Sequence, residues 1–380
     1  MNKHVNIIIA GAGGIAEAVG LILAEQSKVP PTLFIGNRTL SKAQEVVQWI
    51  ERGTSKPTTV KAFELHPNAL SEEANAIFRQ GDILLDCLPG GLAPQMARYA
   101  KIHHLHYANL TEYVDETNQI RALAKDARTG FILQTGLAPG YINVLAHKMF
   151  RDFCDDFNVD IADYLGFKVG ALTLHAVSPH FYGFTWSPIG VATEYVKDAI
   201  AIRAFQKTAL PSLSQRTQLL INGVLYEDDL TSGGAADLPD ALAGRVRTLD
   251  YKTLRHPGHY GWVSDQLKSI PGEEDPIPAL QRAMEEAIPH VEDDQVVLYA
   301  AVEGKDASGV LRRREVAKQI LPLLVGKHKL RAIQATTAAP LIQAAQLLWE
   351  SDLKGVVLQS QINPDTFLNG DFVKSVYGGV

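Results

Sequence analysis

The sequence predicts an α/β fold, in which a doubly wound parallel sheet is joined to a second α+β domain containing a mixed or antiparallel sheet. The chain has 380 residues, which is more than one small core normally accommodates. Short apolar runs alternate with amphipathic segments early in the chain, whereas paired runs separated by turn residues dominate the middle. We therefore expect a first domain at residues 1–140, a second at 141–335, and a segment at 336–380 that returns to the first domain.

The composition excludes several classes of protein. Apolar residues make up 46% of the chain and charged residues 21%, which is ordinary for a globular protein. The net charge of −6 gives no electrostatic reason to expect nucleic acid or a membrane surface as a partner. Cys87 and Cys154 are too few for a disulfide framework or a thiolate metal site. We expect no bound metal and a reducing, cytoplasmic location.

The first expected element is a buried strand at residues 5–10, followed at once by a glycine-rich loop and a helix. The loop reads G-A-G-G-I-A and matches the G-x-G-x-x-G/A pattern of dinucleotide-binding loops. Gly11 permits the tight turn, Gly13 lets the backbone approach a pyrophosphate, and Ala16 lets helix and strand pack closely. Because strand, loop and helix follow in order, we prefer a Rossmann nucleotide site over a glycine-rich turn without a ligand. The expected cofactor contacts are Gly11, Gly13, Gly14, Ile15 and Ala16.

The end of the second expected strand, residues 32–36, bears on the choice between the two nicotinamide dinucleotides. NAD enzymes usually place Asp or Glu about 20 residues beyond the glycine loop, where the acid binds the ribose hydroxyls. This chain has N-R-T-L-S-K there, similar to the N-R-T-x-x-R/K phosphate-binding motif of shikimate dehydrogenases. The alternative interpretation is a solvated helix start with Thr39 or Ser41 as N-cap. NADP is the expected cofactor and NAD the alternative. The expected phosphate contacts are Asn37, Arg38, Thr39 and Lys42.

Further alternation of strands and helices extends the first domain. The expected strands are residues 59–63, 82–86, 106–109 and 131–133, and the expected helix is 119–127. Ligands of such sheets bind outside the carboxyl ends of the strands, which selects the loops at residues 87–91, 110–113 and 136–140. We expect Asp86 to make a structural hydrogen bond and Cys87 to be a packed thiol. The expected cofactor contacts in these loops are Cys87, Leu88, Pro89, Leu110, Thr111 and Ala138.

The second domain shows signals of β-hairpins. Asn222-Gly223 between two apolar runs is a strong two-residue hairpin signal, and residues 295–302 and 310–316 predict a second hairpin. The helical spacing of Tyr141, Leu145 and Met149 predicts a helix that leads into the domain. The remaining expectations are loops at residues 228–244 and 271–278 and a helix at 335–350.

Three segments resemble the saccharopine dehydrogenase family. Residues 136–143 (G-L-A-P-G-Y-I-N) are similar to its G-L-x-P-G-x-x-N segment, and residues 184–188 (F-T-W-S-P) to its T/S-W-S-P stretch. Residues 251–259 (Y-K-T-L-R-H-P-G-H) are similar to its T-L-R-Y-P-G-H segment. The chain departs from the family at Ala138, where some members carry Asp, and at His256, where Tyr is usual.

The resemblance implies reversible dehydrogenation at a carbon bearing nitrogen, with an amino acid as one partner. It also implies an inserted substrate domain and a homodimer formed through that domain's sheet. We therefore expect an NAD(P)-dependent oxidoreductase of the saccharopine or lysine dehydrogenase type. Its substrate would be an amino acid or an amino-acid-derived secondary amine.

Arg255 and His259 are the main candidates for substrate chemistry. Arg255 could clamp a substrate carboxylate through two parallel hydrogen bonds, or instead lie exposed or in an interdomain ion pair. Oxidising an amine requires a group that accepts its proton, for which His259 is the first candidate and Tyr113 the second. The other expected substrate contacts are Trp186, Ser187 and Asn143.

Simpler interpretations and other functions stay open. Ser187 followed by Pro188 is a common helix start, and Trp186 could pack a core instead of lining a site. An NADPH-sensing protein without catalysis and a carboxynorspermidine-type reductase are the alternative functions. An alcohol or hydroxy-acid dehydrogenase is less favoured, because the sequence shows neither a convincing zinc cluster nor a helical Tyr-x-x-x-Lys pair.

Overall fold

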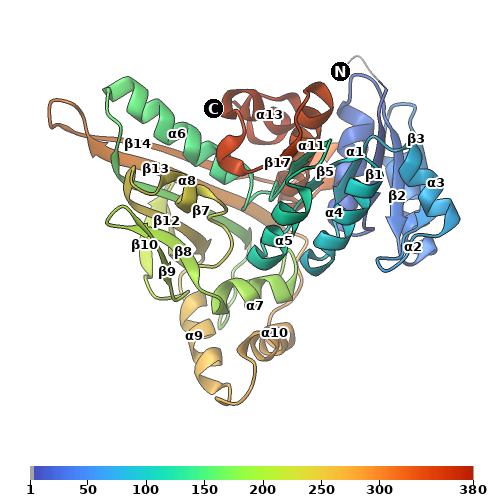
Figure 1. The fold of residues 1–380 in the computed structure, drawn as a ribbon. Helices are drawn as coiled ribbons and strands as arrows, with labels where there is room; N and C mark the ends of the chain where they lie inside the picture. Colours follow the sequence, from blue (N-terminus) through green and yellow to red (C-terminus); the bar gives the residue numbers. More distant parts are fainter. Residues whose placement is uncertain (1–3, 380) are drawn as a thin grey trace. The chain divides into compact units, whose positions relative to one another are not determined.

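The structure is a computed structural model that describes residues 4–379, and it divides into two compact units (Figure 1). Unit 1 contains the chain up to Tyr141, residues 323–330 and the residues from Gln334 onward. Unit 2 contains Ile142–Pro322 and Arg331–Ile333. Unit 1 is therefore assembled from separate stretches of sequence, and unit 2 lies between them along the chain.

Unit 1 is built on a seven-stranded sheet with the order β17-β6-β5-β4-β1-β2-β3, in which every pair of neighbours is parallel. The strands are β1 (Asn6–Ala10), β2 (Thr32–Asn37), β3 (Thr59–Glu64), β4 (Ile83–Asp86), β5 (His106–Asn109), β6 (Gly130–Ile132) and β17 (Gly355–Val357). The apolar run of β1 suits a parallel strand buried on both faces, since Ile7, Ile8 and Ile9 are fully buried. The expected doubly wound parallel sheet is confirmed.

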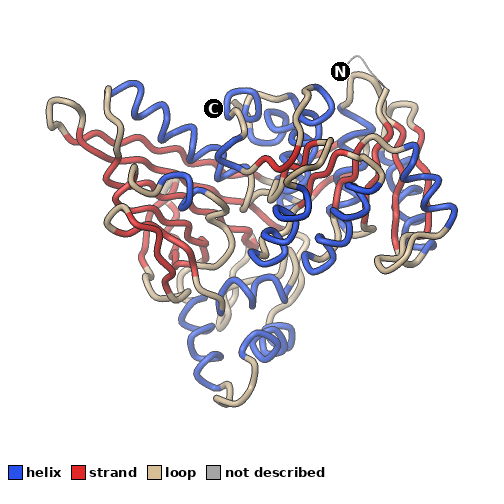
Figure 2. Tube along the Cα trace, viewed as in Figure 1, coloured by secondary structure: helices blue, strands red, loops and turns tan. Residues whose placement is uncertain are grey.

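The helices of unit 1 cover this sheet (Figures 1 and 2). They are α1 (Gly14–Gln26), α2 (Leu40–Gly53), α3 (Glu72–Gln80), α4 (Ala93–Ile102), α5 (Val114–Ala124), α11 (Ala332–Glu350), α12 (Pro364–Leu368) and α13 (Asp371–Tyr377). The helix expected at 119–127 begins five residues earlier, where Asp115 and Glu116 occupy its first turn and suit its dipole. Shorter elements are the 3-10 turns η1 (Gly90–Leu92) and η2 (Gln359–Gln361) and the ribbon β15 (Leu323–Val325) and β16 (His328–Leu330).

Unit 2 is built on an eight-stranded sheet, with the main order β10-β11-β12-β7-β13-β14, and with β8 paired to β12 and β9 paired to β8. The strands are β7 (Ala162–Thr173), β8 (Ala199–Arg203), β9 (Gln206–Leu210), β10 (Thr217–Ile221), β11 (Val224–Leu230), β12 (Val246–Arg255), β13 (Asp294–Lys305) and β14 (Leu311–Ile320). The sheet is mixed, because β12 and β7 run parallel whereas the other pairs are antiparallel. The expected second domain with a mixed sheet is confirmed.

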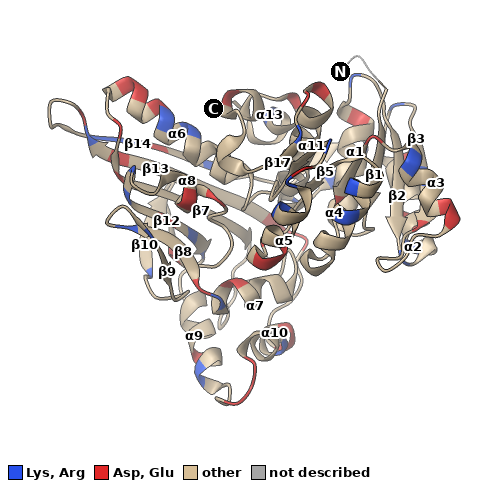
Figure 3. Ribbon diagram, viewed as in Figure 1, with Lys and Arg blue, Asp and Glu red and all other residues tan. Residues whose placement is uncertain are grey.

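Five helices accompany the sheet of unit 2. They are α6 (Tyr141–Phe157), α7 (Pro188–Val196), α8 (Leu238–Leu242), α9 (His259–Ser269) and α10 (Pro276–Ala287). One of them, α6, carries charged residues of both signs (Figure 3). The expected helix that begins near Tyr141 is confirmed. Both expected hairpins are confirmed as well, with Asn222 and Gly223 at φ of 51° and 81° in the first.

Two loop expectations are wrong in part. Residues 228–230 belong to β11, because the carboxylates of Asp228 and Asp229 are buried within the unit instead of solvated. Residues 238–242 form α8, and residues from Pro276 onward form α10. The start of α10 has an ordinary signal, since the Asp275 side chain accepts a hydrogen bond from the Ile277 N–H, and Pro276 occupies the first turn.

Candidate active site

The glycine loop between β1 and α1 has the backbone geometry that its sequence predicts. Gly11 has a φ of 119°, and a Cβ there would lie 3.0 Å from the carbonyl oxygen of Cys87. Gly13 is the N-cap of α1 and has no neighbouring atom within 4 Å of a Cβ position. Ala16 is fully buried in α1. Gly11 is therefore required by the fold, whereas Gly13 leaves space beside the start of the helix.

Two side chains, Gln334 and Asp86, hold this loop and its neighbour, and only the contact of Gln334 was not indicated by the sequence. The Gln334 side chain in α11 donates to the carbonyl of Gly14 at 2.9 Å. Asp86 accepts hydrogen bonds from the N–H of Leu88 at 3.0 Å and from the hydroxyl of Tyr107 at 2.8 Å, which confirms its expected structural role. Burial raises the pKa of Asp86 to about 6.

Cys87 follows Asp86 at the carboxyl end of β4. Burial is the main cause that raises the pKa of its thiol, and the neighbouring Asp86 carboxylate raises it further. Both effects disfavour the thiolate, which is the nucleophilic form of cysteine. The side chain therefore has the character of a packed thiol, as expected.

The end of β2 leads into α2 through the predicted phosphate motif. The Asn37 side chain accepts a hydrogen bond from the N–H of Thr39 at 3.3 Å. Thr39 is the N-cap residue of α2, but its side chain makes no capping bond. Arg38 and Lys42 are exposed. Two cationic side chains and a helix N-terminus thus lie at one end of the sheet, an arrangement that attracts anions.

The ends of β5 and β6 are joined through Asn109. Its side-chain oxygen accepts from the N–H of Gln134 at 2.8 Å, and its backbone carbonyl accepts from Thr135. Thr111 is buried and accepts from the N–H of Tyr113 at 3.2 Å. The Tyr113 backbone caps α5. Among the other expected cofactor contacts, Leu88, Leu110 and Ala138 are half-buried and Pro89 precedes η1.

Glu112 in the same loop is a titratable group that sequence reasoning missed. Burial raises the pKa of its carboxyl group, and the nearby Glu116 raises it further. A carboxyl group with a raised pKa at the ligand edge of a parallel sheet is a candidate for proton transfer. The sequence offered one signal for Glu112, because it lies in the loop at residues 110–113 that was predicted to contact the ligand.

In unit 2, Arg255 ends β12 and is bonded to protein groups. Its guanidinium donates to Glu194 Oε1 at 2.8 Å, to the Tyr195 hydroxyl at 2.6 Å and to the Leu254 carbonyl at 3.0 Å. The residue is 1% exposed, and its guanidinium lies 4.9 Å from the centre of the Tyr182 ring. Arg255 is thus neither exposed nor, in its pair with Glu194, part of an interdomain ion pair, because both residues belong to unit 2. The carboxylate clamp stays a prediction.

His259, the first residue of α9, is fully buried and its two ring nitrogens both have partners. Nδ1 lies 2.7 Å from the His180 carbonyl, so it must be the protonated nitrogen that donates. Nε2 lies 3.0 Å from the Tyr195 hydroxyl, which therefore donates to it while accepting from Arg255. Burial, reinforced by the positive charge of Arg255, holds the pKa of His259 well below its usual value. The imidazole is neutral, and its Nε2 atom already accepts a hydrogen bond from Tyr195.

The remaining predicted substrate contacts have clear local roles. The Ser187 hydroxyl caps α7 by accepting from the N–H of Gly190 at 3.4 Å, with Pro188 next to it, so the predicted helix start is confirmed. Trp186 packs against an aromatic cluster that includes Tyr182 and Tyr260. Asn143 is fully buried and donates to the carbonyl of Gly234 at 2.9 Å. A role in substrate binding stays a prediction for all three.

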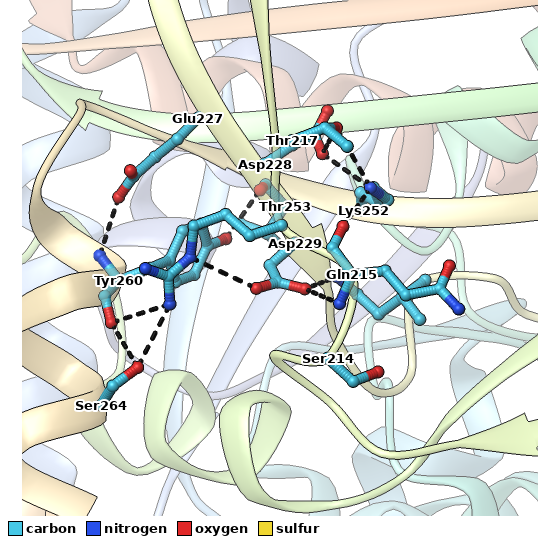
Figure 4. Close-up of polar contacts among 12 residues, drawn as sticks. Ser214, Gln215, Thr217, Glu227, Asp228, Asp229, Lys252, Thr253, Tyr260 and Ser264 are labelled. Atoms are coloured by element: carbon cyan, nitrogen blue, oxygen red, sulfur yellow. Dashed lines mark hydrogen bonds and ion pairs between the residues drawn. The ribbon is translucent and has the colours of Figure 1, made fainter.

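A second polar cluster, drawn in Figure 4, ties α9 to the sheet of unit 2. Glu227 accepts from the backbone N–H of Tyr260 at 2.8 Å, and Arg216 donates to the Tyr260 carbonyl and to Ser264 at 3.1 Å. Asp228 is buried between Lys168 and Lys252 and also accepts from Thr217. These contacts fix the first turn of α9, and so they fix His259.

Two kinds of geometry bear on the residues that the structure describes, that of metal sites and that of membrane-spanning helices. Over residues 4–379, no group of three or more His, Cys, Asp or Glu side chains is arranged to hold a metal ion. In the same residues, no helix has the length and apolar character needed to cross a membrane.

Comparisons with known proteins agree with the segments that the sequence singled out. Residues 7–133 match the family model described as the saccharopine dehydrogenase NADP binding domain, and residues 136–372 match the saccharopine dehydrogenase C-terminal domain. Bovine (Bos taurus) mitochondrial alpha-aminoadipic semialdehyde synthase is 21% identical over 294 residues. That match covers 74% of this chain but only 30% of the length of the bovine protein.

Solved structures share the fold. Saccharopine dehydrogenase (L-Glu forming) from Saccharomyces cerevisiae is 16% identical, with a TM-score of 0.74 and 98% coverage of both chains. Homospermidine synthase from Legionella pneumophila, solved with NAD, is 13% identical, with a TM-score of 0.70, 100% coverage of this chain and 92% of the other. The family models together account for nearly the whole described chain, and they confirm the resemblance found in the sequence. The chain belongs to the saccharopine dehydrogenase family, a family of NAD(P)-dependent oxidoreductases.

Proposed function

We propose that the chain is a dehydrogenase that uses NADP in preference to NAD and acts on the CH–NH group of an amino acid or an amino-acid-derived secondary amine. The observation that carries this proposal is the open glycine loop of unit 1, joined in one chain to the family's C-terminal domain. The substrate class rests on the family, since the relatives of known activity are much longer or distant in sequence.

The residues of unit 1 fit a dinucleotide. The space beside Gly13 and the start of α1 suits a pyrophosphate, because backbone N–H groups and the helix dipole favour negative charge there. Arg38 and Lys42 would hold the 2′-phosphate that distinguishes NADP. When bound, the nicotinamide ring supplies the hydride acceptor. The loops after β4, β5 and β6 would position it.

Protein groups must handle the proton of the amine, because an ammonium group cannot release hydride. His259 is neutral, and it can accept a proton at Nε2 only when the Tyr195 hydroxyl gives up its bond there. Tyr113 remains the second candidate, and Glu112 joins them because of its raised pKa. If His259 is the base, His259→Asn should lower turnover and shift its pH profile, without changing the affinity for NADPH.

Arg255 remains proposed as the carboxylate clamp on one condition. A substrate carboxylate would have to replace Glu194 as the partner of the guanidinium. Arg255→Lys should then lower kcat/KM at least about tenfold with NADPH affinity unchanged, because an ammonium group cannot form two parallel bonds. Normal kcat/KM in a folded Arg255→Lys protein would contradict the clamp.

The decisive experiment is a substrate screen. Lysine, saccharopine and polyamine-derived amines would be offered with NADP⁺ and with NAD⁺, and reduction of the nicotinamide followed by absorbance. Turnover of one of these amines supports the proposal. Tight NADPH binding without turnover of any of them would favour the alternative of an NADPH sensor, and turnover only in the reductive direction with carboxylated polyamines would favour a carboxynorspermidine-type reductase.

We further propose a homodimer in a reducing compartment such as the cytoplasm. Strands β10 and β14 are edge strands of the sheet in unit 2, where a second subunit could add. Cys87 and Cys154 are both free, which fits a reducing environment. Sedimentation analysis of the purified chain tests the dimer, and imaging of the tagged protein in its own cell tests the compartment.

A further inference from the structure

Two titratable side chains lie together at the end of β3, next to the predicted phosphate motif. Glu64 is the last residue of β3, and His66 follows two residues later. The His66 Nε2 and Glu64 Oε1 atoms are 3.0 Å apart, and the two side chains are 55% and 50% exposed. The sequence indicated no role for either residue, and both lie outside the three segments at 136–143, 184–188 and 251–259 that resemble the family.

The register of the sheet places Glu64 beside Asn37. Strands β2 and β3 are parallel neighbours, and Glu64 is the direct partner of Asn37. The N–H of Leu65 donates to the Asn37 carbonyl at 2.9 Å, so the pairing holds to the very end of both strands. Paired residues of adjacent strands lie about 5 Å apart and point to the same face of the sheet.

The pair one residue earlier on the two strands, Gly36 and Phe63, shows on which face of the sheet Glu64 lies. Gly36 is the partner of Phe63, whose ring occupies the space where a Gly36 side chain would lie. Phe63 is fully buried in the core of unit 1. Because successive side chains alternate between faces, Glu64 and Asn37 project from the opposite face, at the carboxyl edge where such sheets bind ligands.

This juxtaposition has a chemical consequence for the cofactor. An acid at the end of β2 normally accepts hydrogen bonds from the ribose hydroxyls of NAD. Here Asn37 occupies that strand end, and the acid is supplied one strand away. A carboxylate there can accept from the ribose hydroxyls of NAD, but it repels the 2′-phosphate of NADP. His66 occupies one of the carboxylate oxygens and so moderates both effects.

We propose that Glu64 is a cofactor-specificity residue that favours NAD over NADP and opposes Arg38 and Lys42, and that His66 tempers it. The proposal rests on the cofactor placement given under the proposed function. It adds that the preference for NADP depends on the attraction of Arg38 and Lys42 for the 2′-phosphate minus its repulsion by Glu64.

The test measures Kd for NADPH and NADH by fluorescence titration, at one pH and low ionic strength because exposed charges are screened by salt. Glu64→Gln should raise the ratio of NADPH affinity to NADH affinity about threefold or more. His66→Gln should lower that ratio about twofold, because Glu64 loses its partner. In the Glu64→Gln background, the His66 substitution should have no further effect on the ratio.

Glu51→Gln is the matched control, since it removes the same charge from the exposed, distal end of α2. An unchanged ratio in Glu64→Gln, or an equal shift in Glu51→Gln, would overturn the role of Glu64. If the parent chain binds both dinucleotides and only the Glu64 effect is missing, this inference alone fails. If the parent chain binds neither dinucleotide, the proposed function fails as well.

Discussion

The dinucleotide edge of unit 1 and the buried ionic network of unit 2 are made in opposite ways. The edge is formed by backbone groups of a glycine loop and by exposed side chains such as Arg38. The network is formed by side chains, with Arg255 and His259 buried and bonded to partners from α7. The exposed side chains of a binding edge of the first kind can be changed without loss of stability, whereas a network of the second kind contributes to folding. Each prediction below tests one side of this contrast.

The largest effect is expected from Arg255→Leu in unit 2. The substitution leaves the carboxylate of Glu194 without its buried partner, which typically costs about 3–5 kcal/mol in the free energy of unfolding. Arg247→Leu is the control, because that arginine is 57% exposed and its pair with Asp163 is worth about 1 kcal/mol or less. Urea unfolding of both variants decides the matter. Equal, small losses would mean that the network contributes little to folding.

Asp86 is a carboxyl group at the dinucleotide edge whose charged form burial disfavours. Its carboxyl group has a pKa of about 6 in the folded chain against 3.8 for the free group. The folded state therefore binds the proton more tightly, and stability falls as the pH rises from about 4 to about 6, by about 3 kcal/mol in total. Above about pH 7 the loss is complete.

Asp86→Asn cannot titrate, so it isolates this contribution. The unfolding free energy of the parent chain minus that of Asp86→Asn should fall by about 3 kcal/mol between about pH 3 and about pH 7. Urea unfolding across this range measures the difference. A difference that does not vary with pH would show that Asp86 ionises normally in the folded chain.

The two glycines of the loop should respond differently to a side chain. Gly13→Val should weaken both dinucleotides about a hundredfold or more, equivalent to about 2.7 kcal/mol, with stability nearly unchanged. A Cβ at this position has no neighbouring atom of another segment within 4 Å, and the valine side chain would enter the space proposed for the pyrophosphate. Gly11→Val should instead destabilise the fold by about 1–3 kcal/mol or more, because of its positive φ and the nearby Cys87 carbonyl. Circular dichroism and fluorescence titration separate the two, and normal NADPH binding by Gly13→Val would remove the proposed site.

Arg38→Ala should have the smallest effect of the series. NADPH affinity should fall about tenfold, or about 1.4 kcal/mol, with NADH affinity nearly unchanged. Arg52→Ala near the far end of α2 is the control for loss of an exposed positive charge. Fluorescence titration of both variants with both cofactors measures the effect. Equal losses for NADPH and NADH would place Arg38 away from the 2′-phosphate.

The same contrast decides how much the sequence could predict. The isoleucine run of β1 and the Asn222-Gly223 hairpin are local signals, and both elements were predicted. Asp228 was assigned to a loop because residues 228–244 are rich in Gly, Ala and Asp, a composition typical of solvated loops. Its partners, Lys168 and Lys252, are distant in sequence, and no local pattern connects them.

Site residues follow the same rule. The glycine loop and the phosphate motif are contiguous, so their residues could be named from the sequence. Tyr195 could not be, because its role depends on Arg255 and His259, which come from other elements. The contact of Gln334 with Gly14 spans 320 positions and likewise has no sequence signature. For Ser187, the local Ser-Pro pattern predicted the helix cap that the structure shows, but no local pattern tests a role in substrate binding.

The pairing of β17 with β6 also bears on how the chain is made. About 220 residues separate Ile132 from Gly355, so β6 is synthesised long before the strand that completes its edge. At translation rates of about 5–20 residues per second, that interval lasts roughly 10–45 s. Throughout it, the nascent sheet presents an open strand edge while the whole intervening unit emerges from the ribosome. Vectorial synthesis thus gives unit 2 the opportunity to fold before unit 1 is complete.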